Sequence, residues 1–206
     1  MTPPAPSLEQ IAGTLSVHQP KTHAPAHRTH AAVAMILRPA KGGPEILFIE
    51  RAHHEGDPWS GDLGFPGGRI EPEDGGARDA SMRETREEIG VDLAGARLLG
   101  RLDDLSGAHL PIVVSCFVFA LEGPVDFSLN EEVMDAFWVP LENLIAPERH
   151  AHATVHFRGT ALVRPALRLL EPPRPVLWGI TYRLVSRFLT LLGRPLPATG
   201  SAASSR

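Results

Sequence analysis

Three glutamates in the middle of the chain, Glu84, Glu87 and Glu88, are spaced so that they could bind a metal ion together. Residues 77–89 around them predict a helix, and Gly90 follows at the position where glycine commonly ends helices. On a helix, residues three and four apart share a face, where like charges repel by about 0.2–0.5 kcal/mol per pair. A cation among the carboxylates would remove that repulsion, and hard oxygen ligands favour Mg²⁺ or Mn²⁺ over zinc or copper.

A pair of glycines upstream of this helix offers a second kind of ligand. Gly67 and Gly68 can adopt backbone conformations that other residues avoid, so a backbone carbonyl there could reach the same ions. A simpler interpretation is a solvated acidic helix face on which Arg83 and Arg86 pair with the glutamates. The glycine pair, the helix and its terminal glycine follow one another as one ordered block, and this arrangement favours the metal site.

This ordered block resembles the Nudix box of the Nudix hydrolase superfamily, which is written G-x5-E-x7-R-E-U-x-E-E-x-G-U with U apolar. Residues 83–91 match its second half except at Thr85, which occupies an apolar position. Counted from Gly68, the first acidic position holds Asp74 in place of glutamate, and one extra residue lies between it and Arg83. The pattern is highly specific and these departures are small.

The longer spacing is similar to that of the coenzyme A diphosphatase branch, and the resemblance extends over residues 30–193. The further segments that match this branch are residues 65–68, 106–111, 137–141 and 178–181. An upstream signature linked with coenzyme A recognition is only partly present. Arg51 and Gly61 match it, but Ala52 replaces a serine. Asp57 replaces an arginine, and a carboxylate cannot pair with phosphate as a guanidinium does.

The resemblance implies a fold and an activity. The fold is α+β, a Nudix-type α/β/α sandwich with a mixed central sheet. The activity is divalent-metal-dependent hydrolysis of a diphosphate bond in a nucleoside diphosphate derivative, coenzyme A-like or related, by attack of water. Divalent ions suit this reaction because they neutralise the diphosphate and lower the pKa of bound water. The alternative is a non-catalytic Nudix-like module that only binds a nucleotide, although a pure binder does not need the whole acidic set.

Specific residues can be assigned to this expected site. The expected ligands of Mg²⁺ or Mn²⁺, in order of preference, are Glu87, Glu88, Glu84 and the Gly68 carbonyl. Arg83 is expected to orient a neighbouring glutamate, as its counterpart does in Nudix proteins. The general base is either a glutamate of the box helix, Glu84 or Glu87, or an acidic residue of a later region that holds Glu131, Glu132 and Asp135. Among those three, Glu132 is the candidate for the base or for an extra ligand. The residues expected to contact the substrate are Arg51, Trp59 and Phe65.

Composition excludes several other classes of protein. The 206 residues include 19 Gly and 20 Pro, an excess incompatible with a coiled coil or a long helical bundle. A net charge of −4 provides no basic field for a nucleic acid polymer, and no apolar run approaches the ~18–20 residues of a membrane span. No signal peptide is visible, so we expect a cytoplasmic protein. Its partner is a small-molecule diphosphate, and a homodimer is possible.

The chain divides into three expected parts. Residues 1–28 form a Pro-rich arm, mobile or loosely docked, with a short possible helix; residues 29–193 form the Nudix domain; residues 194–206 form a loose tail. The expected strands of the domain are 29–38, 45–51, 97–105, 112–122 and 136–139, with a second hairpin over 153–163. The other expected segments are a loop over 53–76, a helical turn over 140–145 and an amphipathic helix over 176–192. Cys116, in an apolar run, is expected to be a packed thiol.

Overall fold

The computed structural model describes residues 4–23, 29–54, 60–107, 111–157 and 159–197. Its centre is an eight-stranded sheet. The strands are β1 (Thr29–Arg38), β2 (Glu45–Arg51), β3 (Leu63–Gly64), β4 (Gly67–Arg69), β5 (Arg97–Arg101), β6 (Leu105–Ser106), β7 (Ile112–Ala120) and β8 (Val133–Pro140). The main order is β3-β2-β1-β7-β5, with β4 beside β1, β6 beside β7 and β8 beside β2. β1 and β7 are parallel and the other pairs are antiparallel, so the sheet is mixed.

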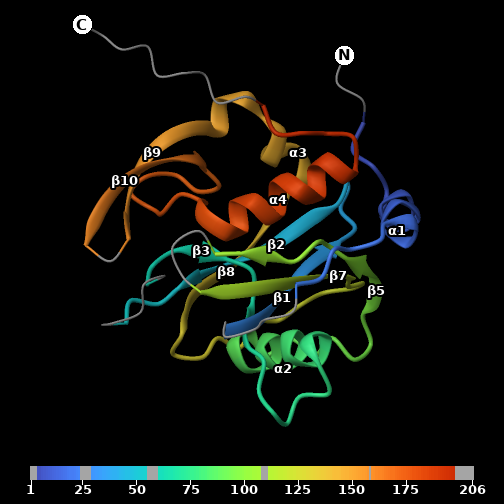
Figure 1. The fold of residues 1–206 in the computed structure, drawn as a ribbon. Helices are drawn as coiled ribbons and strands as arrows, with labels where there is room; N and C mark the ends of the chain where they lie inside the picture. Colours follow the sequence, from blue (N-terminus) through green and yellow to red (C-terminus); the bar gives the residue numbers. More distant parts are fainter. Residues whose placement is uncertain (1–3, 24–28, 55–59, 108–110, 158, 198–206) are drawn as a thin grey trace, which may run out of the picture.

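Helices cover both faces of this sheet. They are α1 (Leu8–Val17), α2 (Ala77–Ile89), α3 (Leu141–Ile145) and α4 (Gly179–Leu191). Figure 1 shows α2 below the sheet and α4 above it. Because strand residues alternate between faces, Ile36 of β1 joins the core with Ile89 of α2, whereas Met35 joins the core with Phe188 of α4. The expected α+β fold, an α/β/α sandwich with a mixed central sheet, is confirmed.

Helix α2 has the bounds that the sequence predicts. Thr85, which stands in an apolar position of the box, is fully buried, and its Oγ1 donates a hydrogen bond to the Ser81 carbonyl at 2.7 Å. The hydroxyl is therefore satisfied within the helix and does not prevent burial. Gly90 ends the helix in the left-handed conformation, with φ of 72°, and its N–H donates to the Arg86 carbonyl.

The N-terminal residues contain the short helix that the sequence indicates, but this helix is packed against the domain and is not part of a loose arm. The Ser7 hydroxyl accepts from the Gln10 N–H and the Gln10 side chain accepts from the Ser7 N–H, a capping box that starts α1. Ile11 and Leu15 of α1 are buried in the core beside β5. Gly100 of β5 allows this close packing, because a Cβ there would lie 2.8 Å from the Leu15 Cβ. Ile11 and Leu15, one helical turn apart, thus attach the N-terminal segment to the domain, although its Pro-rich composition indicates a loose arm.

The start of the expected C-terminal tail is packed as well. Arg194 is only 8% exposed, and its two terminal nitrogens donate to the two carboxylate oxygens of Glu142 at 2.6 and 2.9 Å. Residue 194 therefore belongs to the folded structure, because its bidentate ion pair ties the end of α4 to α3. The final residues of the expected tail, 198–206, lie outside the described residues.

Three other segments differ in detail from the sequence expectation. The expected loop over 53–76 contains β3 and β4, which pair with β2 and β1 and are too short and glycine-rich to show an apolar alternation. The expected strand over 97–105 is divided into β5 and β6. The last helix begins at Gly179 rather than near residue 176, because Leu177 pairs with Leu167 in an antiparallel bridge.

The second hairpin, β9 (His150–Phe157) and β10 (Thr160–Leu167), forms a separate two-stranded sheet.

Cys116 lies in β7 with no exposed surface. Burial raises the pKa of its thiol to about 12, so the expected packed thiol is confirmed. Among the residues described, no helix is both long enough and apolar enough to cross a membrane.

Candidate active site

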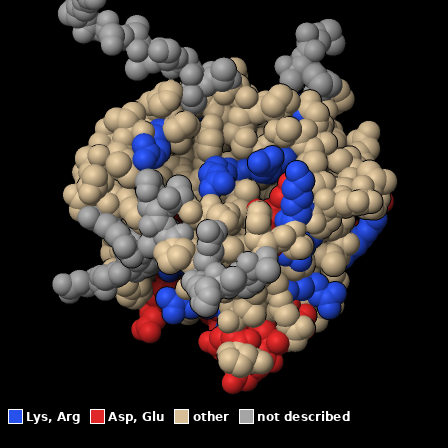
Figure 2. All heavy atoms as spheres, viewed as in Figure 1, with Lys and Arg blue, Asp and Glu red and all other residues tan. Residues whose placement is uncertain are grey.

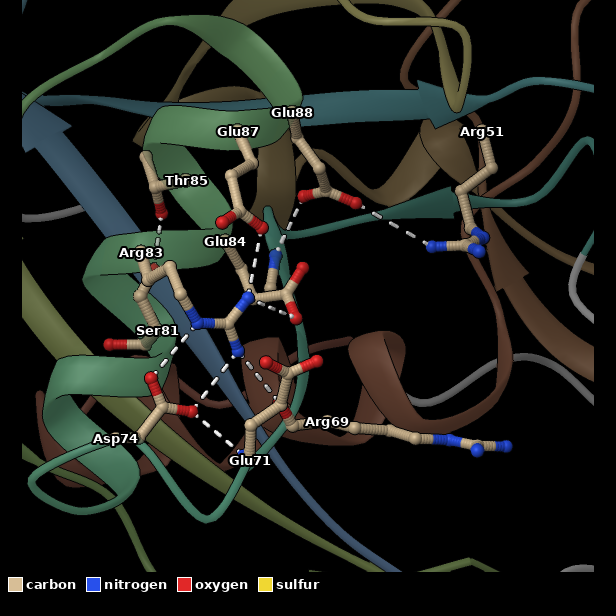
Figure 3. A network of polar contacts seen from close by, with 11 residues as sticks. Arg51, Arg69, Glu71, Asp74, Ser81, Arg83, Glu84, Thr85, Glu87 and Glu88 are labelled. Carbon is tan, nitrogen blue, oxygen red and sulfur yellow. Dashed lines mark hydrogen bonds and ion pairs between the residues drawn. The ribbon is translucent and has the colours of Figure 1, made fainter.

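Helix α2 carries the three glutamates on the face that looks toward the short strand β4 (Figure 3). Their environments differ strongly. The Glu88 side chain is 2% exposed and the Glu84 side chain 16%, whereas the Glu87 side chain is 55% exposed. Figure 2 shows Asp and Glu gathered at the lower end of the molecule, around the loop that precedes α2, and Lys and Arg over α4. The three predicted carboxylates thus lie on one helix but differ in their access to solvent.

Arg83 is the centre of the polar network drawn in Figure 3. Its Nη1 donates to Glu84 Oε1 at 3.1 Å and to Glu87 Oε2 at 2.9 Å. Its Nε and Nη2 donate to the two carboxylate oxygens of Asp74 at 2.9 and 3.1 Å, and Nη2 also reaches the Arg69 carbonyl at 3.1 Å. The hydrogen bond from Arg83 holds the pKa of Asp74 below its usual value. The arginine therefore contacts two of the predicted ligands, and its role in orienting them stays a prediction.

Glycines bring the backbone of β4 next to these side chains. A Cβ at Gly67 would lie 2.3 Å from the Ala32 carbonyl oxygen, and its φ of 146° lies in the region that favours glycine. A Cβ at Gly68 would lie 2.4 Å from the Glu84 carboxylate. No other residue fits at either position without displacing a neighbour, so the pair of glycines allows the carboxylates and the strand to approach one another.

Glu88 is the most deeply buried of the predicted ligands. Its Oε2 accepts a hydrogen bond from the Gly67 N–H at 2.8 Å, and its Oε1 lies 3.8 Å from Arg51 Nη1. Burial raises the pKa of Glu88 to about 8, because these two partners do not replace the lost hydration of the carboxylate. Burial also raises the pKa of Glu84, although Arg83 opposes the shift. Both carboxylates would be stabilised in their ionised form by an added cation.

Glu132 lies in the loop before β8 and is exposed. Its negative charge contributes to the raised pKa values of both Glu84 and Glu88. Asp135, from the same acidic stretch, is bound instead by Arg174, whose Nη2 donates to Asp135 Oδ2 at 2.7 Å. Of these two later acidic residues, Glu132 is the one whose charge affects the pKa values of the helix carboxylates.

The three residues expected to contact the substrate differ in where they lie relative to the site. Arg51 lies at the site beside Glu88. Phe65 does not: it is 4% exposed and its ring stacks on Phe48 with centroids 5.0 Å apart. Its motif indicates a functional segment, but the alternation along the chain turns this side chain into the core, so the prediction of a substrate contact is wrong. Trp59 lies outside the described residues.

The donors at this site suit a hard divalent cation. In the described part of the chain, no three His, Cys, Asp or Glu side chains are already gathered at metal-binding separation. Glu84 and Glu87 are instead held by Arg83. The chemistry of the donor set nevertheless fits, because three carboxylates and a glycine carbonyl are the ligands that Mg²⁺ and Mn²⁺ prefer. The raised pKa values of Glu84 and Glu88 agree with this, because a nearby cation would stabilise their ionised forms.

Sequence reasoning missed several contacts that support the site. Asp74 occupies an unusual position in the box pattern, and the structure makes it the bidentate partner of Arg83. Arg174, far along the chain, forms ion pairs with Glu50 and Asp135 of neighbouring strands. No local pattern signals such pairs, because their members are brought together only by the fold. For Asp74, the acidic type and the spacing from Arg83 are the signal that could have been used.

Fold and site together define an α/β/α domain with three glutamates on the helix beside the glycine strand β4, and comparisons identify the family. The NUDIX domain pattern matches residues 28–158. The mitochondrial coenzyme A diphosphatase NUDT8 of Homo sapiens is 32% identical over 175 residues, which cover 81% of this chain and 71% of that protein. The chain belongs to the Nudix hydrolase family. It is a hydrolase of the class that acts on phosphorus-containing anhydrides, and Nudix hydrolases act on small nucleotide substrates and generally use divalent metal ions.

Two other curated relatives match at different lengths. The uncharacterized Nudix hydrolase NudL of Yersinia enterocolitica is 25% identical over 182 residues, which cover 88% of this chain and 91% of that protein. The uncharacterized protein C14C4.10c of Schizosaccharomyces pombe is 36% identical over 118 residues, but the match spans only 36% of its length. A solved structure of a MutT/nudix family protein from Enterococcus faecalis, 17% identical, covers 92% of this chain and 75% of its own with a TM-score of 0.54. That likeness concerns the fold alone.

Proposed function

We propose that this protein hydrolyses a diphosphate bond in a nucleoside diphosphate derivative, using Mg²⁺ or Mn²⁺ bound at the carboxylates of α2. The observation that carries the proposal is the burial of Glu84 and Glu88 against the glycine strand β4 with raised pKa values. A helix that only faced solvent would not bury a carboxylate to 2% exposure with its nearest guanidinium nitrogen 3.8 Å away.

The residues that would hold the cation are Glu87, Glu88, Glu84 and the Gly68 carbonyl. When bound there, a divalent ion supplies charge neutralisation for the diphosphate and lowers the pKa of water. Arg83 donates hydrogen bonds to the carboxylates of Glu84 and Glu87 and would hold these side chains in position. Asp74 in turn accepts a hydrogen bond from Arg83 and restrains it. Phosphoryl transfer depends chiefly on such positioning and on electrostatic stabilisation.

We assign Glu132 as the general base. Its carboxylate would accept a proton from the attacking water at one of its Oε atoms, while the exposed position of the residue allows water to enter. Glu84 and Glu87 are poorer candidates because each already accepts a hydrogen bond from Arg83 Nη1. Proton transfer of this kind contributes roughly 10²–10⁴-fold to a rate.

The proposed substrate is coenzyme A or a related nucleoside diphosphate derivative. The human relative named as a coenzyme A diphosphatase supports this class, as does the resemblance of residues 65–68 and 178–181. In this proposal Arg51, which lies beside Glu88, contacts a phosphate of the substrate through its guanidinium. Trp59 remains a proposed stacking partner for the base. Ala52 departs from the coenzyme A signature, so related diphosphates are included in the proposal.

Product analysis tests this function directly. The purified protein is incubated with Mg²⁺ or Mn²⁺ and with coenzyme A, ADP-ribose or dinucleoside polyphosphates, and products are separated by chromatography. We expect at least one compound to yield two phosphate-bearing products, and we expect EDTA to stop the reaction. Tight binding of one compound without cleavage under any of these conditions would contradict the proposal and favour a nucleotide-binding module.

A further inference from the structure

The loop that carries Glu132 is attached to the end of the box helix. The Ser128 N–H donates to the Ile89 carbonyl at 2.9 Å, and the Asn130 N–H donates to the Glu88 carbonyl at 3.0 Å. A Cβ at Gly90 would lie 2.8 Å from the Ser128 Cβ, so glycine at this position permits the contact as well as the helix end. Two otherwise unpaired carbonyls of the last helical turn are thus satisfied by this loop.

Asn130 extends this attachment to Glu132. Its side-chain Oδ1 accepts a hydrogen bond from the Glu132 N–H at 2.9 Å. On the other side, the Glu132 carbonyl accepts from the Ala52 N–H at 2.8 Å. The backbone of Glu132 is therefore held between Ala52, the residue that follows β2, and Asn130, and Asn130 is held by the backbone of the predicted ligand Glu88.

The strand that follows begins with an irregularity. Arg51 of β2 pairs with Val133, and its neighbour Glu50 pairs with Asp135, so Met134 is an extra residue in β8. Such bulges bend a strand and redirect its side chains, and they are common beside active sites. The bulge and the Asn130 contact act on the same short segment. Together they act where the chain enters β8, directly after Glu132.

We propose that Asn130 is a positioning residue that sets Glu132 against the carboxylates of α2. The proposal rests on the proposed function for its catalytic consequence, but its structural part can be tested without turnover. Asn130 links the helix that carries the proposed metal ligands to the residue assigned as the base, through its backbone N–H on the helix side and its side-chain Oδ1 on the Glu132 side. A shift of the helix end would then move the ligand and the base together and preserve their separation.

Amide hydrogen exchange in the metal-free protein tests the structural part. In Asn130→Ala the Glu132 N–H loses its acceptor, so its exchange should accelerate about 10-fold. Asn130→Asp retains an oxygen acceptor and should keep the protection. Ser128→Ala is the matched control, because only backbone atoms of Ser128 hydrogen-bond to the helix. Unchanged exchange at Glu132 in Asn130→Ala would overturn the positioning role.

A double-mutant cycle tests the catalytic part. We expect Asn130→Ala to lower kcat about 10- to 100-fold with little change in KM, because a misplaced base affects the chemical step. Added to Glu132→Gln, it should cause little further loss, since it acts through Glu132. If the loss of kcat in the double variant equals the product of the losses in the two single variants, the proposal is wrong. If the wild-type protein cleaves nothing while the exchange result holds, the proposed function fails and the positioning contact stands.

Discussion

Glu88 of the candidate site and Asp104, in the segment between β5 and β6, are both 2% exposed, but their pKa values move in opposite directions. For both residues burial is the largest effect and raises the pKa. At Asp104 the hydrogen bonds outweigh burial and hold the pKa below its usual value. At Glu88 they do not, and the pKa rises to about 8. The difference therefore lies in the partners that each carboxylate has.

Asp104 has a complete set of donors. Its Oδ2 accepts from the His23 N–H at 2.9 Å, and its Oδ1 accepts from Ser115 Oγ at 2.8 Å and Arg101 Nη2 at 2.6 Å. A buried carboxylate with this many donors is stabilised as an anion. It ties the N-terminal segment to the central sheet and needs no further ligand.

Glu88 has one short hydrogen bond, from the Gly67 N–H, and a more distant guanidinium at Arg51. The comparison indicates how a structural carboxylate differs from one that is suited to a ligand. Both are buried, but only the structural one has enough donors from its own chain. The charge that Glu88 still requires is the charge that a divalent cation would bring.

Substitution of Glu87 should have the largest effect on activity. Glu87→Gln removes a proposed ligand but leaves an exposed side chain of the same size, so turnover should fall roughly 100-fold or more while the fold is kept. The measurement is kcat with Mg²⁺ together with circular dichroism. Glu122→Gln, an exposed acid outside the site, is the matched control. Near-full activity of Glu87→Gln with bound Mg²⁺ would contradict the assignment.

Substitution of Asp104 should affect stability instead. Asp104→Asn leaves Arg101 without its ionic partner and should lower the free energy of unfolding by about 2–3 kcal/mol near pH 7. Because the folded-state pKa of Asp104 is lowered, its ionised form contributes stability above its unfolded pKa, and that contribution is lost as the pH falls through the folded pKa. Urea unfolding from pH 7 to pH 3 should therefore show the difference from wild type shrinking. A constant difference would contradict the comparison.

The two arginines beside these carboxylates should also behave differently. Arg51→Gln should raise KM roughly 10-fold, the equivalent of about 1.4 kcal/mol, and change stability by less than about 1 kcal/mol. Arg101→Gln should lower stability by about 1–2 kcal/mol and leave KM unchanged. Steady-state kinetics and thermal unfolding measure both. Equal effects of the two substitutions on stability would mean that Glu88 and Asp104 have similar partners after all.

The sequence predicts the box helix and its contents well, because the signals there are local. The helix over 77–89, its end at Gly90 and the shared face of Glu84 and Glu88 all follow from spacing. The roles of these carboxylates stay predictions, but their proximity and burial are now described. The mixed sheet follows from the family resemblance.

What the sequence could not predict depends on contacts distant along the chain. The sequence indicates a possible short helix where α1 lies, but the close packing of its Leu15 depends on Gly100, 85 positions later. Asp104 receives a hydrogen bond from His23, 81 positions away. Phe65 stands in a functional motif, yet the direction of its side chain depends on the pairing of β3 and β4. Motifs locate a segment, whereas packing decides which of its side chains reach the site.

The stability of Glu88→Gln in the absence of divalent ions tests the central claim most directly. Glutamine can still accept from the Gly67 N–H but carries no charge, so at neutral pH the variant should be more stable than wild type by about 1–2 kcal/mol. Mg²⁺ should then raise the thermal midpoint of wild type and leave that of the variant nearly unchanged. A variant that is less stable than wild type without metal, and is still stabilised by Mg²⁺, would contradict the account.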